Sequence, residues 1–358
     1  PSPAIRGLVR VCGMLVCGML CGPDLLAQPH MENLNRGVVA LRTSSTQVHV
    51  SWRFLGLDPD TTGFHVFRSI GGGAPVQLTS TPLTATTDYR DTPGSGAFSS
   101  TISYHVRPVV DGVVGDPSES FILPANTVTQ PYLTIPIEAP PGGTTPTGET
   151  YTYSANDAAP ADLDGDGTLD IVLKWDPSNS KDNSFSGYTG EVYLDGYKLD
   201  GTRLWRINLG PNIRAGAHYT QFIAYDLDSD GRAEVAMKTA PGTLDGLGNP
   251  VILPGDSPTA DYRSGNGYIL SGPEYLTIFD GLTGAALATT SYVPVRGTIS
   301  NWGDSYGNRV DRFVAGVAYL DGSRPSLVMC RGYYTQTHLV AWDWRDRQLT
   351  ERWHFNAP

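Results

Sequence analysis

Apolar and polar positions alternate in short runs along the first third of the chain. Residues 47–53 (QVHVSWR) and 63–68 (GFHVFR) show this period of two, and the run SYHVRPV follows at 103–109. Such alternation predicts strands with one buried face, and the clusters of Pro, Gly, Ser and Asp between the runs predict turns. We therefore predict a β-sandwich over residues 31–125, with Trp52 as an aromatic residue of its core.

A second pattern begins at Tyr151, where an acidic stretch followed by an apolar run occurs three times. The copies read ADLDGDGTLDIVLK at 161–174, YDLDSDGRAEVAMK at 225–238 and, in degenerate form, AYLDGSRPSLVMC at 318–330. Each copy is followed by a further strand that ends in a turn. Repeated units of short antiparallel strands predict the blades of a β-propeller, so the whole chain is expected to be all-β.

This repeat sets the expected layout of the domains. Residues 126–150, rich in Pro, Gly and Thr, are expected to form an extended linker between the sandwich and part of a propeller at 151–358. A propeller closes with about four to eight blades, and three blades would leave exposed sheet edges. We expect the remaining blades beyond Pro358; a complete three-bladed protein is the alternative. The strand order of the sandwich resembles a fibronectin type III-like module, a similarity of fold rather than of function.

The first residues have the pattern of a secretory leader. Arg6 and Arg10 precede an apolar run at 11–22, and a cleavage site with a small residue follows at 25–28. A short membrane anchor is the alternative, but a spanning helix needs about 20 apolar residues. We therefore expect a signal peptide over 1–27 and a secreted mature chain, extracellular or periplasmic, that contains no membrane segment.

Composition fits a turn-rich globular protein. The 358 residues include 41 Gly and 27 Pro, and no long helical period survives them. The net charge is −11 without a basic patch or stripe, which argues against a nucleic-acid partner. Three of the four cysteines lie in the predicted leader, so Cys330 alone remains and cannot form an intramolecular disulfide. Some other stabilising device is expected, and the sequence indicates a metal.

Two copies of the repeat carry carboxylates at loop positions 1, 3, 5 and 9, with a backbone carbonyl available at position 7. This set of hard oxygen ligands suits Ca²⁺, which takes six to eight oxygens. The candidate ligands are Asp162, Asp164, Asp166, Thr168 and Asp170 in the first loop, Asp226, Asp228, Asp230, Arg232 and Glu234 in the second, and Asp157 as an addition to the first. Leu173 and Met237 stand where an EF-hand has its last Glu, so these are expected to be β-loop sites. The alternative is an acidic turn without metal, which the repulsion among four carboxylates disfavours. Such sites are commonly structural and do not by themselves indicate an enzyme.

Basic residues recur at the end of the same repeat. Lys174 and Lys238 occupy equivalent positions, and Cys330 takes that place in the third copy with Arg331 next to it. Because a charge in a buried strand is costly without a partner, two interpretations stay open. The basic groups converge on one mouth of a central channel, or each lysine pairs with a carboxylate of a metal loop.

Four loops gather Asp, Asn, Arg, His and Tyr side chains, often next to glycine. They are residues 176–183 (DPSNSKDN), 213–222 (IRAGAHYTQF), 306–313 (YGNRVDRF) and 330–335 (CRGYYT). Arginine and tyrosine in such a setting suit a wall that binds sugar rings and carboxylates. Each residue taken singly is as compatible with a solvated loop or with packing.

Several long stretches resemble the family 11 polysaccharide lyases, which are rhamnogalacturonan endolyases. They include NDAAPADLDGDGTLDIVLKWDPSNSKDN, SGYTGEVYLDGYKLDGTRLWRINLG, YGNRVDRFVAGVAYLDG and MCRGYYTQTHLVAWDWR, and the match runs from about residue 31 to 358. The resemblance implies an eight-bladed propeller preceded by an all-β domain. Family members are larger than this chain, so the resemblance also implies that later blades are absent from it.

The resemblance further implies β-elimination in rhamnogalacturonan I, at the bond between rhamnose and galacturonate. That reaction needs a neutralised carboxylate, by Ca²⁺ or by basic side chains, and a base that takes the C5 proton. By matching motifs, the resemblance carries substrate contacts over to Asn156 and Asp176. Our own candidates for neutralisation or proton transfer are Lys238, Arg214, His218, Arg309 and Arg331. None of these is singled out as the base.

Two functions without catalysis stay open beside the lyase. One is a calcium-stabilised propeller of the adhesion type that binds a ligand, and the other is a glycan-binding module. Only the lyase would release an unsaturated uronate that absorbs ultraviolet light. For all three functions we expect a monomer, and for the lyase a polysaccharide substrate; endo and exo cleavage are not distinguished.

Overall fold

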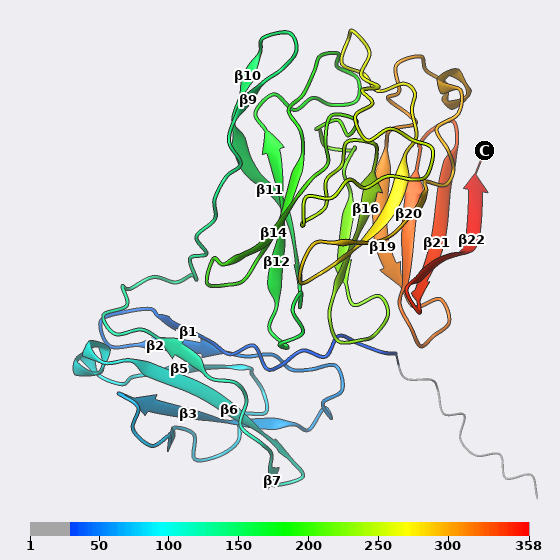
Figure 1. Ribbon diagram of the computed structural model, residues 1–358. Helices are drawn as coiled ribbons and strands as arrows, with labels where there is room; N and C mark the ends of the chain where they lie inside the picture. Colours follow the sequence, from blue (N-terminus) through cyan, green and yellow to red (C-terminus); the bar gives the residue numbers. More distant parts are fainter. Residues whose placement is uncertain (1–28, 358) are drawn as a thin grey trace, which may run out of the picture.

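The computed structural model describes residues 29–357 of the chain (Figure 1). The signal peptide predicted at 1–27 lies outside the described residues. Two short 3-10 helices, Ser95–Ser99 and Ile299–Trp302, are the only helices in the described part, and β-strands make up the rest of the regular structure. None of the helices found in 29–357 is long and apolar enough to span a membrane. The prediction of an all-β chain is confirmed.

Two antiparallel sheets form the N-terminal sandwich. One sheet has the order β1 (Val39–Arg42), β2 (Val48–Ser51), β5 (Asp88–Asp91). The other has the order β4 (Val76–Gln77), β3 (Gly63–Ile70), β6 (Ile102–Val110), β7 (Val113–Val114), with β8 (Phe121–Leu123) also paired to β6.

Alternate residues of β2, β3 and β6 enter one shared core. Val48 and Val50 from the first sheet cluster with Phe64 and Ile102 from the second, as the alternation predicts. Trp52 is also buried in this cluster, and its ring lies 5.5 Å from that of Phe64 between centroids. The prediction for Trp52 is confirmed.

The connection from the sandwich is mostly irregular until it reaches a small hairpin. Strands β9 (Gly143–Thr144) and β10 (Thr150–Tyr151) pair within and just after the range that composition assigns to a linker. Gly143 packs against the Tyr151 ring, where an added Cβ would lie 2.4 Å from the phenolic oxygen. The sequence predicts only an extended segment here, because strands of two residues are too short to show a detectable alternation of apolar and polar positions.

Three four-stranded antiparallel meanders follow. The first contains β11 (Tyr153–Ala161), β12 (Asp170–Pro177), β13 (Tyr193–Tyr197) and β14 (Arg203–Asn208). The second contains β15 (Phe222–Tyr225), β16 (Glu234–Thr239), β17 (Tyr275–Asp280) and β18 (Ala286–Ser291). The third contains β19 (Phe313–Ala318), β20 (Ser326–Arg331), β21 (Thr337–Arg345) and β22 (Gln348–Ala357).

The three sheets stand side by side, and their first strands β11, β15 and β19 adjoin one another in order (Figure 1). One hydrophobic cluster, which includes Val172, Trp205 and Phe279, packs the first sheet against the second. Another, which includes Ile278, Met329 and Trp344, packs the second against the third. Over residues 153–357 the sheets are separate and none closes into a barrel.

The loops divide between two edges of this array (Figure 1). Loops after the first and third strands of each sheet gather at the edge next to the sandwich, where the backbone N–H of Asn35 donates to the carbonyl of Gly167 at 2.7 Å. Loops after the second and fourth strands gather at the opposite edge, which we call the free edge. It comprises residues 178–192, 209–221, 240–274, 292–312 and 332–336. The acidic loops seen in the sequence therefore lie at the edge next to the sandwich. The loops that gather Arg, His and Tyr lie at the free edge.

The packing between sheets predicts a large effect of truncating Phe279, which is fully buried in the first cluster. Phe279→Ala should lower the free energy of unfolding by about 3–5 kcal/mol, because it removes apolar contact and leaves a cavity. Phe355→Ala is the matched control, since Phe355 is 54% exposed. Urea unfolding followed by tryptophan fluorescence measures both; equal losses would contradict the packing described here.

Candidate functional site

The two acidic loops lie at the edge next to the sandwich, between the first and second strands of the first two sheets. Carboxylate oxygens of Asp162, Asp164 and Asp170 all lie within 4.8 Å of one another. The second loop places Asp226, Asp228 and Asp230 in the same relation. The structure thus brings together six of the predicted ligands in two groups.

Backbone hydrogen bonds shape both turns. Asp162 accepts from the N–H of Gly165 at 2.8 Å and of Gly167 at 2.7 Å, and both glycines have φ near +80°. A side chain is disfavoured at such an angle, so the repeated glycines are required by the turn. In the second loop, Asp226 accepts from the N–H of Gly231 at 3.0 Å.

Crowding of these carboxylates disfavours their ionisation. Burial raises the pKa of Asp170 to about 7 and that of Glu234 to about 8, and the nearby carboxylates of Asp164 and Asp228 add to the shift. A divalent cation would remove this penalty, and a set of carboxylate and carbonyl oxygens is the donor set that hard cations take. The residues present therefore fit a metal ion, although geometry alone does not identify which one.

The other predicted ligands have partners within the protein. Asp166 lies 3.2 Å from the ammonium of Lys198, which also pairs with Asp164. Arg232 lies 3.7 Å from Asp230, and the hydroxyl of Thr168 accepts from the side-chain amide of Asn35 at 2.9 Å. The acidic loops are thus partly neutralised by the chain itself.

The degenerate third copy forms a turn without a cluster. Asp321 accepts from the N–H groups of Ser323 and Arg324 at 2.8 and 2.7 Å. No group of three acidic residues gathers around it in the part of the chain that the structure describes. Tyr319 and Ser323 stand where the other two copies have their first and third carboxylates, which explains the difference.

Lys174 and Lys238 lie on the second strands of their sheets, β12 and β16, and have different partners. Lys174 is buried and pairs with Asp157, an exposed residue of β11. Lys238 pairs with Glu274 at 3.2 Å. Neither lysine forms an ion pair with a clustered loop carboxylate within 29–357, and only Lys238 joins a larger group of charges.

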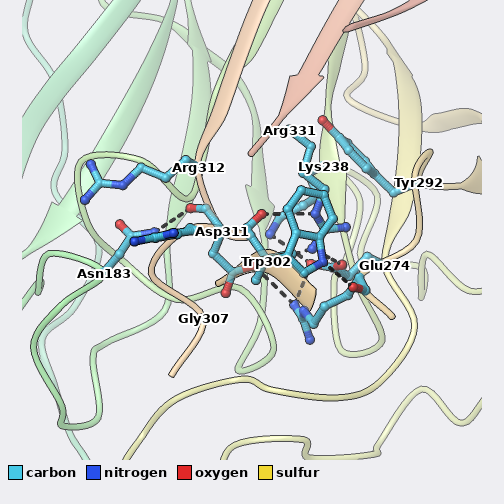
Figure 2. A network of polar contacts seen from close by, with 12 residues as sticks. Asn183, Lys238, Glu274, Tyr292, Trp302, Gly307, Asp311, Arg312 and Arg331 are labelled. Atoms are coloured by element: carbon cyan, nitrogen blue, oxygen red, sulfur yellow. Dashed lines mark hydrogen bonds and ion pairs between the residues drawn. The ribbon is translucent and has the colours of Figure 1, made fainter. Parts of the chain in front are cut away.

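That group is a buried network at the free edge, centred on Glu274 (Figure 2). The Glu274 carboxylate lies 2.5 Å from the guanidinium of Arg296 and 2.7 Å from that of Arg331. Asp311 is the second acid, at 3.6 Å from Arg296 and 3.5 Å from Arg331. All five charged side chains, including Lys238, are at least nine-tenths buried.

Three cations thus meet two carboxylates in the interior. Burial opposes the ionisation of Glu274, but Arg296, Arg331 and Lys238 outweigh it and hold the pKa of Glu274 below its usual range. Burial also lowers the pKa of Lys238. Removing one member would leave buried charges uncompensated, which makes such a network costly to break.

The network joins segments from all three sheets. Lys238 comes from β16, Arg331 from β20, and Asp311 from the loop before β19. The side-chain amide of Asn183, in the loop between β12 and β13, donates to the backbone carbonyl of Asp311 (Figure 2). The free edge is therefore held together by polar contacts below its surface.

Arg214 is a third buried arginine of this edge, after Arg296 and Arg331. Its guanidinium donates to the carbonyls of Phe185 and Gly187 and to the Tyr219 hydroxyl. It also lies 4.8 Å from the ring centroid of Tyr268. Arg214 thus ties the loop at 178–192 to the loop at 209–221.

Above this layer lies a more accessible group of His218, Asp182 and Arg312. The Nε2 atom of His218 is 3.7 Å from one Asp182 oxygen, and the Arg312 guanidinium is 3.6 Å from the other. The His218 side chain is 38% exposed. Burial and the charge of Arg312 lower the pKa of His218 below 6.5, against the opposing effect of Asp182. The imidazole is therefore neutral at pH 7 and free to accept a proton.

Arg309 and the two substrate candidates are also at the surface. The Arg309 guanidinium donates to the Thr335 hydroxyl and lies 5.9 Å from the Tyr334 ring. Asn156 is exposed on β11, within an irregularity between Ala155 and Ala158 where the register with β12 shifts. Asp176 is half-buried near the end of β12, paired in register with Ser154. A bulge of this kind re-aims side chains.

Sequence reasoning missed several members of these groups. Asp182 and Arg312 lie in the loops at 176–183 and 306–313 that it identified, but composition did not single them out. Glu274 and Arg296 lie outside every identified loop. Glu274 ends a long loop between two strands of one sheet. The length of that loop could have drawn attention to it, but does not indicate which of its residues matters.

Comparison with known proteins places the chain in a family. Residues 132–358 match the model described as "Rhamnogalacturonan lyase family 11, C-terminal domain", and residues 29–122 match "Rhamnogalacturonan I lyases beta-sheet domain". Rhamnogalacturonan endolyase YesW of Bacillus subtilis (strain 168) is 56% identical over 331 residues, which are 92% of this chain and 50% of that protein. Rhamnogalacturonan exolyase YesX of the same organism is 54% identical over 327 residues, 91% of this chain and 50% of that protein.

Solved structures agree with this placement. The structure of exotype rhamnogalacturonan lyase YesX has a TM-score of 0.83 at 54% identity, over 92% of this chain and 52% of that one. The structure titled "Bacillus licheniformis Rhamnogalacturonan Lyase PL11" also has a TM-score of 0.83, at 56% identity, over 92% of this chain and 53% of that one. The chain spans about half the length of the relatives it matches. On these matches, as the resemblance in sequence predicted, the chain belongs to family 11 of the rhamnogalacturonan lyases.

Proposed function

We propose that the protein is a secreted, calcium-stabilised rhamnogalacturonan lyase that cleaves the bond between rhamnose and galacturonate by β-elimination. The observation that carries the proposal is the identity of more than half of the aligned residues with an endolyase and an exolyase for this polymer. A supporting observation is that Arg309 and Arg312 lie beside the Tyr334 and Tyr333 rings at the free edge. The three sheets with adjoining first strands suit consecutive blades of a propeller, with the free edge as its substrate face.

The chemistry assigns a role to the accessible group at this face. In β-elimination a base removes the C5 proton of galacturonate, the electron pair forms the C4–C5 double bond, and the sugar oxygen at C4 leaves. His218 is the candidate base, because it is neutral, accessible and within 3.7 Å of the Asp182 carboxylate. Arg312 and Arg309 are the nearby cations that can neutralise the uronate carboxylate.

The remaining candidates divide by burial. Lys238 and Arg331 are buried in ion pairs, and Arg214 is buried and hydrogen-bonded to two carbonyls and a hydroxyl. These positions suit holding the loops of the free edge in place more than touching a polymer. Asn156 is exposed and Asp176 is half-buried, so both retain some exposure for the substrate contacts that the resemblance implies. Ca²⁺ would compensate the charge of the carboxylates in each acidic loop and so stabilise the two turns beside the sandwich. The carboxylates are those of Asp162, Asp164 and Asp170 in the first loop and of Asp226, Asp228 and Asp230 in the second.

A histidine variant tests the role of the candidate base. His218→Ala should lower kcat on rhamnogalacturonan I by about 10²–10⁴, the usual contribution of a positioned base. His49→Ala is the matched control, because the His49 side chain is 39% exposed but lies in the sandwich. Ultraviolet absorbance of the unsaturated uronate measures both. An unchanged rate in His218→Ala would remove His218 from the mechanism, and no absorbance from the parent chain with calcium present would favour glycan binding without cleavage.

The pH profile gives an independent check. Since the pKa of His218 lies below 6.5, the neutral form predominates at pH 7 and is lost as the pH falls through that pKa. The value of kcat/KM should therefore fall on the acid side of pH 6.5. Asp182→Asn removes the group that favours the protonated form, while Arg312, which disfavours it, stays. This variant should shift the acid limb to still lower pH; a shift to higher pH would refute the assignment.

Calcium removal tests the structural role of the acidic loops. A ligand present at 100 times its Kd stabilises the folded state by about 2.7 kcal/mol, so a chelator should lower the Tm measurably. Replacing Asp226 and Asp228 with Ala should abolish this response for the second loop and lower Tm more than it alters substrate preference. Asp116→Ala, an exposed position of the sandwich, is the control. Equal melting temperatures with and without chelator would contradict the proposed calcium sites.

A further inference from the structure

An unusual backbone turn stands at the tip of the loop between β20 and β21. Tyr334 has φ of +64°, and the N–H of Thr335 donates to the carbonyl of Tyr333 at 2.9 Å across it. This hydrogen bond between residues two apart, with a left-handed residue at the centre, defines a γ-turn of the rare and strained kind. A bulky aromatic residue is unfavourable at such a position.

The Tyr334 side chain makes few packing contacts that would offset this backbone strain. The Tyr334 side chain is 83% exposed, the largest value among the exposed apolar and aromatic side chains of residues 29–357. Its nearest aromatic neighbour is the Tyr333 ring, with centroids 4.1 Å apart. A large ring that is both strained in backbone and open to solvent indicates selection for something other than folding.

The base of the loop is firmly held, so the ring has a fixed position. Gly332 donates its N–H to the carbonyl of Arg312 at 2.8 Å, and an added Cβ there would lie 2.4 Å from the Trp302 ring. The Asn308 amide donates to the Tyr333 hydroxyl at 3.2 Å. Trp302 in turn lies against the buried network and donates to the carbonyl of Arg296 at 2.7 Å (Figure 2). The loop is thus anchored on the Glu274 network.

Positive charge flanks the ring. Arg309 lies 5.9 Å from the Tyr334 centroid, and Arg312 lies 4.6 Å from the Tyr333 centroid. The Arg309 guanidinium forms no ion pair with an acid among the described residues, and its one side-chain hydrogen bond is to Thr335. An arginine with spare donors beside an exposed ring matches a carboxylate next to an apolar surface.

We propose that Tyr334 is a stacking platform for a pyranose ring of an acidic polysaccharide, with Arg309 binding the carboxylate of a neighbouring uronate. The C–H face of a pyranose packs on an aromatic face, while the charged group of the adjoining sugar reaches the guanidinium. This inference rests on the proposed function and names a subsite for its substrate. The His218 group lies one step along the same edge, since Arg312 contacts both Asp182 and the Tyr333 ring.

Affinity electrophoresis of the whole chain in gels that contain rhamnogalacturonan I tests the platform. Tyr334→Ala should weaken binding about tenfold, the loss expected for one aromatic contact with a sugar. Tyr334→Phe should bind like the parent, because the ring face and not the hydroxyl makes the contact. Arg309→Gln should weaken binding to rhamnogalacturonan but not to a neutral galactan.

A second variant separates binding from folding. Tyr334→Asn should raise the Tm by a few degrees, because Asn tolerates left-handed backbone, while it weakens binding as Ala does. Tyr132→Ala is the control, since Tyr132 is 61% exposed on the connector beside the sandwich. It should alter neither property.

Binding by Tyr334→Ala as tight as that of the parent would overturn the proposal. So would a lower Tm in Tyr334→Asn, which would make the ring a structural element. A parent chain that is not retarded in the gel overturns the platform and counts against the lyase as well. A parent chain that is retarded but releases no unsaturated uronate counts against the lyase alone, and the Tyr334 variants then still decide the platform.

Discussion

The free edge depends on the pairing of buried charges around Glu274. Lys238, Arg296 and Arg331 are each removed from water, and a buried cation is costly unless carboxylates or other acceptors reach it. Because these cations come from β16, from the loop before β19 and from β20, satisfying them forces those segments of the second and third sheets together. Asn183 adds the first sheet through the carbonyl of Asp311. The buried network around Glu274 therefore fixes the positions of the free-edge loops that pack on it.

The edge next to the sandwich meets the opposite electrostatic problem. There the carboxylates outnumber the basic groups, so the effect of burial is not offset and the pKa values of Asp170 and Glu234 are raised. Lys198 offsets part of the charge in the first loop, and an external cation is the remaining means of compensation. The free edge thus contains its own counter-charges, and the edge next to the sandwich has two acidic clusters whose oxygens fit a cation. Under the proposed function, the edge next to the sandwich would join the two domains and the free edge would present a surface to a polymer.

Prediction from sequence succeeded where the signal was local. Alternation placed the sandwich strands and Trp52, and the spacing of aspartates placed two carboxylate clusters. It was weaker where the partner is distant. Lys174 and Lys238 look equivalent in the repeat, yet Lys174 pairs with an exposed Asp157 and Lys238 with a buried Glu274. Glu274 lies in a long loop outside the repeat, so no alignment of the copies could identify it.

The sequence by itself determined the strands, the turns and the oxygen-rich loops, because hydrophobic period, glycine conformation and carboxylate spacing act over a few residues. Tertiary structure decided which polar residues are buried scaffold and which are accessible. His218 is neutral because burial and Arg312 outweigh Asp182, and those three residues come from three different connections. Likewise, the exposure of Tyr334 and its strained turn depend on Trp302 and Arg312 beneath it. Ionisation and exposure follow from what surrounds a group in space, and only the packing of the sheets sets those surroundings.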